Sequence, residues 1–334
     1  MANLCFHFPF LLFSLLCFHF TLCFTNFTTY DELALLALKF SVKDPYNYLA
    51  NWSNSSSICN WVGVMCDAHH ERVIVLNLGE MGLKGTLPSK IGNLSFLVEL
   101  DLHSNNLYGE LPKELIQLHK LQILNLSYNE FKGEIPTWIG SLFMLQHFHL
   151  RNNSFGGVFP KSISNLSNKQ AFRKNTSNYL QLTSLELLSL SRNFLTGDIP
   201  NEIANLTNLK IMYLGRNQLI GYIPRSIGSL VSLQELQLGS NNLQGDIPRE
   251  IGHLQNLKLL YLGGNNLSGQ IPSNIFNISE LQVIDLSWND LSKVFPQVYV
   301  MDFQNYKGYI FKKMHYLEPC HPIGYNAKSS KTYI

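Results

Sequence analysis

The sequence predicts an α/β protein: a right-handed solenoid with short parallel strands on its concave face and a helical cap at its N-terminus. Leucines recur at a fixed period, as at Leu94, Leu118 and Leu142, which are 24 residues apart. Paired leucines alternate with polar residues, the pattern of a strand with one buried face. Asn, Gly and Pro also recur in each period, and recurring proline excludes a continuous helix. One period cannot bury its own leucines, but stacked periods can.

Nine frames fit this period, beginning near positions 70, 94, 118, 142, 182, 206, 230, 254 and 278. Parallel strands need a long return path, which the rest of each frame supplies. An asparagine recurs where each strand ends, and its amide can bond to backbone groups of neighbouring coils. The asparagines of this series are Asn105, Asn129, Asn153, Asn193, Asn217, Asn241, Asn265 and Asn289.

The pattern is interrupted twice. Pro160 and Pro200 are 40 residues apart rather than twice 24, so we interpret residues 166–181 as a short, decayed repeat. The alternative is a protruding loop that contacts a ligand, and this segment carries local positive charge. The repeat pattern ends at Pro296, and residues 297–334 form a non-repeat tail. A truncated gene model or a genuine secreted short form would explain that ending.

The N-terminal region predicts export. The stretch from Phe8 to Phe24 is almost wholly apolar, so residues 1–25 are interpreted as a signal peptide, with an uncleaved signal anchor as the alternative. Residues 26–69 then form a cap with a helix at about 30–43, followed by the solenoid at 70–296. A capping helix would cover the open edge of the first coil.

Cysteines and sequons agree with export. Three of the six cysteines fall in the signal region, and an exported chain would oxidise the neighbouring Cys59 and Cys66 to a disulfide, which leaves Cys320 as a free thiol. Asn-x-Ser/Thr sequons are dense, which suits a glycosylated surface. The candidate glycosylation sites are Asn26, Asn51, Asn54, Asn93, Asn165, Asn175, Asn205, Asn266 and Asn277, and further sequons begin at Asn125 and Asn152.

The repeat and cap motifs resemble a known family. Gly221-x-Ile223-Pro224 recurs as Gly269-x-Ile271-Pro272, and the cap reads Cys59-Asn-Trp-Val-Gly-Val-Met-Cys66. These motifs are similar to the plant extracellular leucine-rich repeat over residues 27–296, and the N-terminal part resembles receptor-like kinases of the flagellin-receptor and rice-blight-receptor type. The resemblance implies a second short strand in each coil, a twisted solenoid and a structural role for the cap. Because no kinase motif is present, kinase activity is not carried over.

The candidate binding surface consists of polar residues that alternate with the buried leucines, because these face outward from the strands. Exposed aromatic residues and arginines are frequent anchors of peptide interfaces. The candidate ligand-binding residues are Asp101, His103, Tyr128, His147, His149, Arg151, Arg192, Tyr213, Arg216, Gln237, Tyr261, Asp285 and Trp288.

Two clusters stand out within this set. Tyr213 and Tyr261, with glycines at 215, 239 and 263, predict a flat and partly apolar strip that a ligand backbone can approach closely. His147 and His149 share one strand face about 6.6 Å apart. They favour a pH-sensitive or anion-binding patch over a metal site, which would need a third ligand. The alternative is ordinary polar surface.

The sequence predicts recognition rather than catalysis. With 14% charged residues and a net charge of +2, it offers no case for nucleic-acid binding, and we expect no cofactor and no enzymatic activity. The resemblance implies an extracellular ligand-recognition module of a receptor-like protein, in defence or developmental signalling. It would be secreted or at the cell surface, without a transmembrane helix in the mature chain. Its expected partners are a peptide or protein ligand and a co-receptor kinase. The alternatives are a secreted inhibitor of microbial wall-degrading enzymes, of the polygalacturonase-inhibitor type, and a fragment of a receptor serine/threonine kinase.

Overall fold

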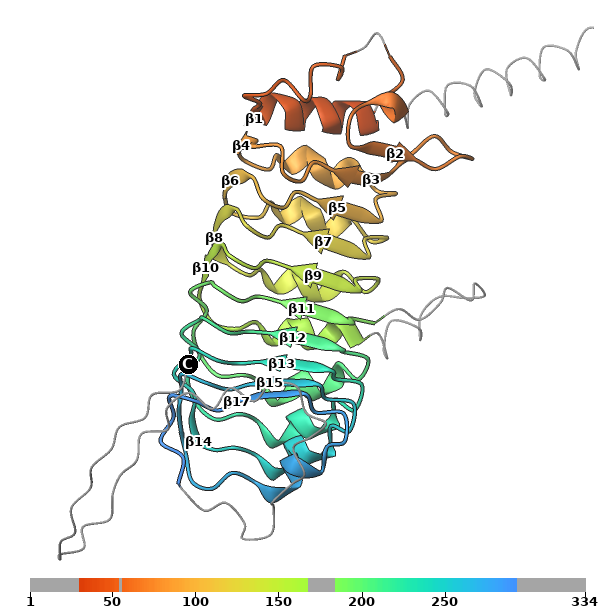
Figure 1. The fold of residues 1–334 in the computed structure, drawn as a ribbon. Coiled ribbons are helices and arrows are strands. Elements are labelled where there is room, and N and C mark those ends of the chain that lie inside the picture. The colour runs from red at the N-terminus through yellow and green to blue at the C-terminus, as the bar shows by residue number, and fades with distance from the viewer. Residues whose placement is uncertain (1–29, 54–55, 168–183, 293–334) are drawn as a thin grey trace, which may run out of the picture.

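The computed structural model describes residues 30–53, 56–167 and 184–292. The predicted signal peptide, most of the segment 166–181 and the predicted tail lie outside these residues. The described chain winds into a stack of coils with strands on one side and short helices behind them (Figure 1). The predicted solenoid is confirmed.

The concave face is one ten-stranded sheet. Its strands are β2 (Val64–Cys66), β3 (Val73–Asn77), β5 (Glu99–Asp101), β7 (Ile123–Asn125), β9 (His147–His149), β11 (Leu187–Ser189), β12 (Ile211–Tyr213), β13 (Glu235–Gln237), β15 (Leu259–Tyr261) and β17 (Val283–Asp285). All neighbours pair in parallel except β2, which runs antiparallel to β3. Each of the nine frames contributes one strand, and β2 comes from the cap.

A second, interrupted set of short strands runs along one lateral edge, where the family resemblance implied it. One group contains β1 (Val42–Lys43), β4 (Lys84–Gly85), β6 (Asn106–Gly109), β8 (Glu130–Glu134) and β10 (Ser154–Gly156), and another contains β14 (Gln244–Asp246) and β16 (Asn266–Ser268). Single bridges such as Asp198 to Ile220 connect the coils between these groups.

The convex side carries 3-10 helices, and in most coils a proline precedes the helix. They are η1 (Ile58–Asn60) in the cap, then η2 (Ser89–Asn93), η3 (Lys113–Gln117), η4 (Thr137–Ser141), η5 (Lys161–Ser167), η7 (Asn201–Asn205), η8 (Arg225–Ser229), η9 (Arg249–His253) and η10 (Ser273–Asn277). Proline fixes φ and needs no donor partner, which suits the start of a helix. The repeat leucines between the layers form one continuous buried core.

The asparagine series joins adjacent coils. Asn153 is typical: its Oδ1 accepts the N–H of Phe131 at 3.0 Å, and its Nδ2 donates to the carbonyls of Leu126 and Leu150 at 2.9 and 3.1 Å. The amide therefore satisfies backbone groups of its own coil and the preceding one. These three bonds are buried, so each coil depends on its neighbour for polar satisfaction.

The interpretation of residues 166–181 as a decayed repeat is wrong. Strand β9 pairs directly with β11 in the register of the other coils, with Phe148 opposite Leu188. The Leu185 N–H donates to the Leu166 carbonyl at 3.2 Å, as Leu97 donates to Leu94 in a regular coil. Leu166 and Leu185 therefore occupy neighbouring positions of one coil. The 40-residue spacing is one coil of 24 with an insertion, not two coils with a deletion.

The cap is anchored to the first coil by a buried ion pair. Its helix covers residues 30–41, close to the predicted range. The Asp31 carboxylate, fully buried on this helix, accepts two hydrogen bonds from the Arg72 guanidinium at 2.8 Å and one from the Val73 N–H at 3.0 Å. Because Val73 begins β3, these contacts fix the helix against the edge of the sheet.

The remainder of the cap packs around two tryptophans. The stacked rings of Trp52 and Trp61 have centroids 5.3 Å apart. The predicted disulfide between Cys59 and Cys66 is present, with an S–S distance of 2.01 Å.

Candidate functional site

The outward positions of the concave strands form two parallel columns. In most strands a buried central residue lies between two partly exposed ones, as for Leu236 between Glu235 and Gln237. Parallel pairing in constant register places equivalent residues side by side, for example Tyr213, Gln237 and Tyr261. The predicted surface residues of the strands therefore do share one face.

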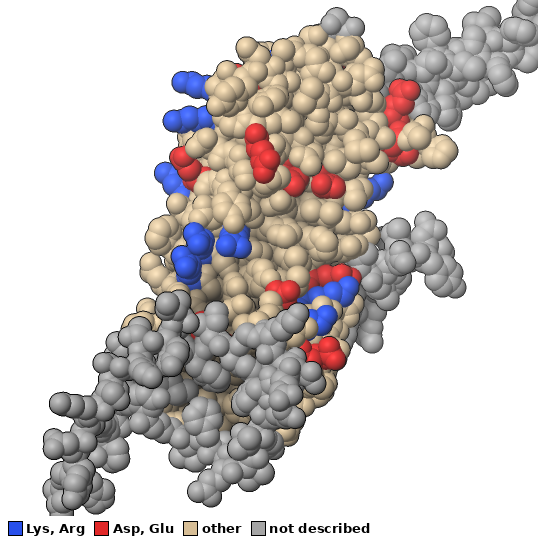
Figure 2. Space-filling model, in the orientation of Figure 1, with Lys and Arg blue, Asp and Glu red and all other residues tan. Residues whose placement is uncertain are grey.

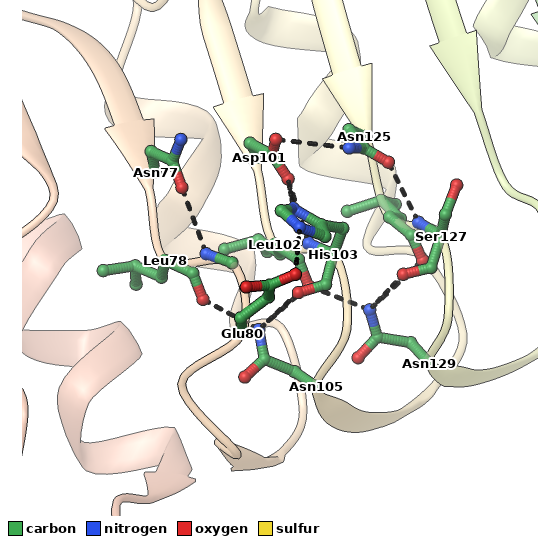
Figure 3. A network of polar contacts seen from close by, with 12 residues as sticks. Asn77, Leu78, Glu80, Asp101, Leu102, His103, Asn105, Asn125, Ser127 and Asn129 are labelled. Atoms are coloured by element: carbon green, nitrogen blue, oxygen red, sulfur yellow. Dashed lines mark hydrogen bonds and ion pairs between the residues drawn. The ribbon is translucent and has the colours of Figure 1, made fainter.

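In the N-terminal coils the polar residues bond mainly to one another (Figure 3). His103 Nδ1 lies 2.7 Å from an Asp101 carboxylate oxygen, and its Nε2 lies 3.5 Å from Glu80. Asn125 donates to the other Asp101 oxygen at 3.2 Å. Burial alone would lower the pKa of His103, but the Asp101 and Glu80 carboxylates outweigh it and raise that pKa. Asp101 and His103 thus form an internally satisfied cluster.

His147 and His149 lie on β9, and their ring centroids are 6.1 Å apart. Burial, reinforced by the neighbouring His147, lowers the pKa of His149 to about 4. His149 is therefore neutral in mildly acidic surroundings, which disfavours it as the protonated group of an anion-binding patch. Among the residues that the structure describes, no group of three or more potential ligands could hold a metal ion.

A hollow of about 280 Å³ opens on the concave face beside β11 to β17. Six of the predicted residues line it: Arg151, Arg192, Arg216, Gln237, Tyr261 and Asp285. Its floor contains the predicted glycines 215, 239 and 263 and no bulky side chain. A Cβ added to Gly239 would lie 2.8 Å from the Gly263 carbonyl oxygen, so each glycine also permits close coil stacking.

Tyr213 does not line this hollow. Its hydroxyl donates to the Glu235 carboxylate across adjacent strands, and burial together with this bond raises the pKa of Tyr213. The two residues of the predicted aromatic strip therefore have different surroundings: Tyr213 is hydrogen-bonded to Glu235, whereas Tyr261 lines the hollow. Glu235 was missed by the sequence analysis, although it faces outward on β13 two residues before the predicted Gln237, and this alternation could have identified it.

Four predicted residues follow the strands in the left-handed region. Tyr128, Arg192, Arg216 and Trp288 have φ of 56–57° and side chains that are exposed. Their backbones are held by inter-coil bonds, as when the Arg192 N–H donates to the Gly215 carbonyl at 3.0 Å. Tyr128 lies nearer the N-terminus than the hollow, with Arg151 5.7 Å from its ring centroid. Trp288 follows β17, at the last described coil.

The glycosylation sites stay predictions, but the structure places most of them. Asn51, Asn165, Asn205, Asn266 and Asn277 are exposed, and Asn93 is half-buried. Four of these lie in 3-10 helices on the convex side, away from the concave sheet: Asn93, Asn165, Asn205 and Asn277. Asn26, Asn54 and Asn175 lie outside the described residues, as does Cys320. No helix in the described ranges is both long and apolar enough to cross a membrane.

Family comparisons match the cap and the coils separately. The leucine rich repeat N-terminal domain matches residues 29–67. Leucine-rich-repeat families match residues 231–291 and five further stretches, 96–118, 120–142, 144–166, 184–206 and 208–230. The gap between 166 and 184 coincides with the insertion.

Individual relatives are plant receptors. The LRR receptor-like serine/threonine-protein kinase EFR of Arabidopsis thaliana is 48% identical over 84 residues, which cover 25% of this chain and 8% of the relative. The solved ectodomain of the receptor kinase GASSHO1/SCHENGEN3 from Arabidopsis thaliana, in complex with CASPARIAN STRIP INTEGRITY FACTOR 2, is 36% identical with a TM-score of 0.70. The match covers 78% of this chain and 30% of that one.

A second solved structure is the Arabidopsis receptor kinase HAESA in complex with the peptide hormone IDA and the co-receptor SERK1. It is 30% identical with a TM-score of 0.63, covering 78% of this chain and 46% of that one. The matched regions therefore span less than a tenth of the receptor kinase EFR and less than half of each solved receptor chain.

Proposed function

Because the chain belongs to the leucine-rich-repeat family, we propose that it is an extracellular recognition module whose concave face binds a peptide or protein ligand. The hollow carries this proposal: it gathers cationic, polar and aromatic side chains over a glycine floor, and its residues come from several coils. Such convergence of a few polar groups in a concave site is typical of ligand binding.

The cellular role follows from the relatives. The similarity to the receptor-like kinase EFR supports a receptor role at the cell surface, and we propose that this role lies in defence or developmental signalling. The complex of HAESA with IDA and SERK1 supports a peptide as ligand and a co-receptor kinase as second partner. We propose that the chain has no catalytic activity, and that its concave surface binds a ligand without changing it chemically.

Binding to the concave face can be tested with a displayed library of random peptides about twelve residues long, enough to run the length of the sheet. The secreted chain, a concave variant and a convex variant would be panned in parallel. The concave variant carries Gln237→Ala with Tyr261→Ala, two half-exposed positions on the hollow. The convex control carries Asn201→Ala with Arg225→Ala, both exposed.

Peptides enriched on the wild type should lose binding to the concave variant and keep it on the convex one. Equal binding to both variants would refute the proposed surface. Inhibition of a fungal polygalacturonase by the purified chain, weakened by the substitutions of the concave variant, would instead favour the inhibitor alternative.

A further inference from the structure

The hollow holds three arginines that have no acidic partner. Arg151, Arg192 and Arg216 come from three successive coils, so at the usual strand spacing they span about 10 Å. Two cations elsewhere in the described ranges show the contrast, because Arg72 pairs with Asp31 and Lys210 pairs with Glu186. No ion pair within the described part of the chain involves the three arginines of the hollow. Figure 2 shows basic side chains grouped at the level of the middle coils, below acidic ones of the first coils.

Arg151 is the innermost of the three. It is half-buried, and its Nε is shielded from solvent without a hydrogen-bond partner. Buried donors are almost always satisfied, and guanidinium groups bond carboxylates with special strength. The side chain is therefore arranged to receive an acceptor that comes from outside the described chain.

We propose that this hollow binds a short acidic segment of a peptide ligand, with two or more carboxylates within about 10 Å. This inference rests on the proposed function and adds the chemical class of the ligand. One carboxylate can neutralise only one guanidinium. The mutual repulsion of three cations is relieved only when several negative charges arrive together.

The neighbouring charges limit how long the acidic segment can be. Asp101 lies on β5, two coils before β9, or about 10 Å towards the N-terminus. Asp285 lies at the other end of the hollow, three coils beyond β12. A uniformly anionic chain would meet both carboxylates, which oppose it. A peptide with one short acidic run avoids them, which favours a peptide over an anionic polysaccharide.

The test uses the same random peptide library, now scored for composition. Peptides enriched on the wild type should carry adjacent Asp or Glu residues flanked by uncharged or basic ones. Arg151→Gln, Arg192→Gln and Arg216→Gln should each weaken their binding about tenfold or more, since a hydrogen bond to a charged group contributes strongly. Arg225→Gln, an exposed arginine on the convex helix η8, is the matched control and should leave binding unchanged.

Enriched peptides without acidic residues would overturn this inference while leaving the proposed function intact. If the enriched peptides bind the three arginine variants as tightly as the wild type, this inference is likewise overturned and the proposed function is left intact. Affinity for oligogalacturonates that rises with chain length would replace the peptide by a polysaccharide. Absence of any enrichment over an unrelated solenoid would overturn both the inference and the proposed function.

Discussion

Replacing Asn193 by alanine tests whether the asparagine series holds the coils together. Asn193 is 6% exposed and lies at the junction that the insertion interrupts in sequence. Its Oδ1 accepts the Phe155 N–H at 3.0 Å, and its Nδ2 donates to the Leu150 and Leu190 carbonyls at 2.9 and 3.0 Å. Alanine removes all three bonds and leaves the backbone partners buried.

The expected loss follows from these bonds. A buried donor left without a partner costs about 1–3 kcal/mol, and each carbonyl that loses its donor costs about 1 kcal/mol. Asn193→Ala should therefore lower the free energy of unfolding by about 3–5 kcal/mol. Asn193→Asp keeps the acceptor but brings a carboxylate against two carbonyl oxygens, so it should destabilise at least as much.

Urea unfolding followed by far-ultraviolet circular dichroism measures the loss, with Asn208→Ala as control. Asn208 is an exposed asparagine in the next frame, and its replacement should change stability by less than about 0.5 kcal/mol. If both variants unfold at the same urea concentration, the asparagine bonds make no net contribution to the free energy of unfolding.

Three further substitutions test the cap and the histidine pair. Cys59→Ser with Cys66→Ser should cost about 2–3 kcal/mol through loss of a short closed loop, measured as a lower melting temperature that matches the reduced wild type. Asp31→Ala should cost about 3–5 kcal/mol because it leaves Arg72 buried and unpaired, whereas Glu32→Ala on the same helix should be nearly neutral by the same melting assay. The pKa of His149 is lowered to about 4 in the folded chain, so the folded protein keeps the full contribution of neutral His149 to its free energy of unfolding above pH 6.5. As the pH falls from 6.5 to about 4 the unfolded chain binds the proton first, and stability should drop by about 2–3 kcal/mol. In His149→Gln that drop should be missing from the pH dependence of unfolding, and an unchanged profile would contradict the assignment.

The sequence predicted the solenoid because the leucine spacing determines which residues are buried. The columns of outward residues followed from the same alternation. Contacts between outward side chains did not follow, because they depend on how neighbouring side chains of the same and of adjacent coils lie in space. The Tyr213 hydroxyl bonds Glu235 and His103 bonds Asp101, so these predicted anchors are partly occupied by their neighbours. The three arginines lie on successive coils because β9 pairs directly with β11 despite the sixteen extra residues between them in sequence.

The insertion itself shows why counting residues was insufficient. A spacing of 40 residues can be read as two coils short by eight or as one coil with sixteen extra residues. Only the pairing of Phe148 with Leu188 and the bond from Leu185 to Leu166 decide between them.

Deleting residues 168–183 tests this conclusion directly. The deletion joins Ser167 to Ser184 and gives Leu166-Ser-Ser-Leu185, the spacing of Leu94-Ser-Phe-Leu97 in a regular coil. Because the two leucines already occupy neighbouring positions, the shortened chain should fold and keep the Asn193 bonds. Closing a shorter loop costs less entropy, so the free energy of unfolding should rise by about 1–2 kcal/mol.

The matched control deletes sixteen residues from a regular coil, residues 120–135, which contain β7 and β8. That deletion removes a strand from the concave sheet together with its buried leucines, so the product should be unfolded or strongly destabilised. Urea unfolding compares both with the full chain. A decayed repeat would contribute its own strand and core residues, so its deletion would prevent folding. If the 168–183 deletion does not fold, the decayed-repeat interpretation is restored and β9 does not pair directly with β11.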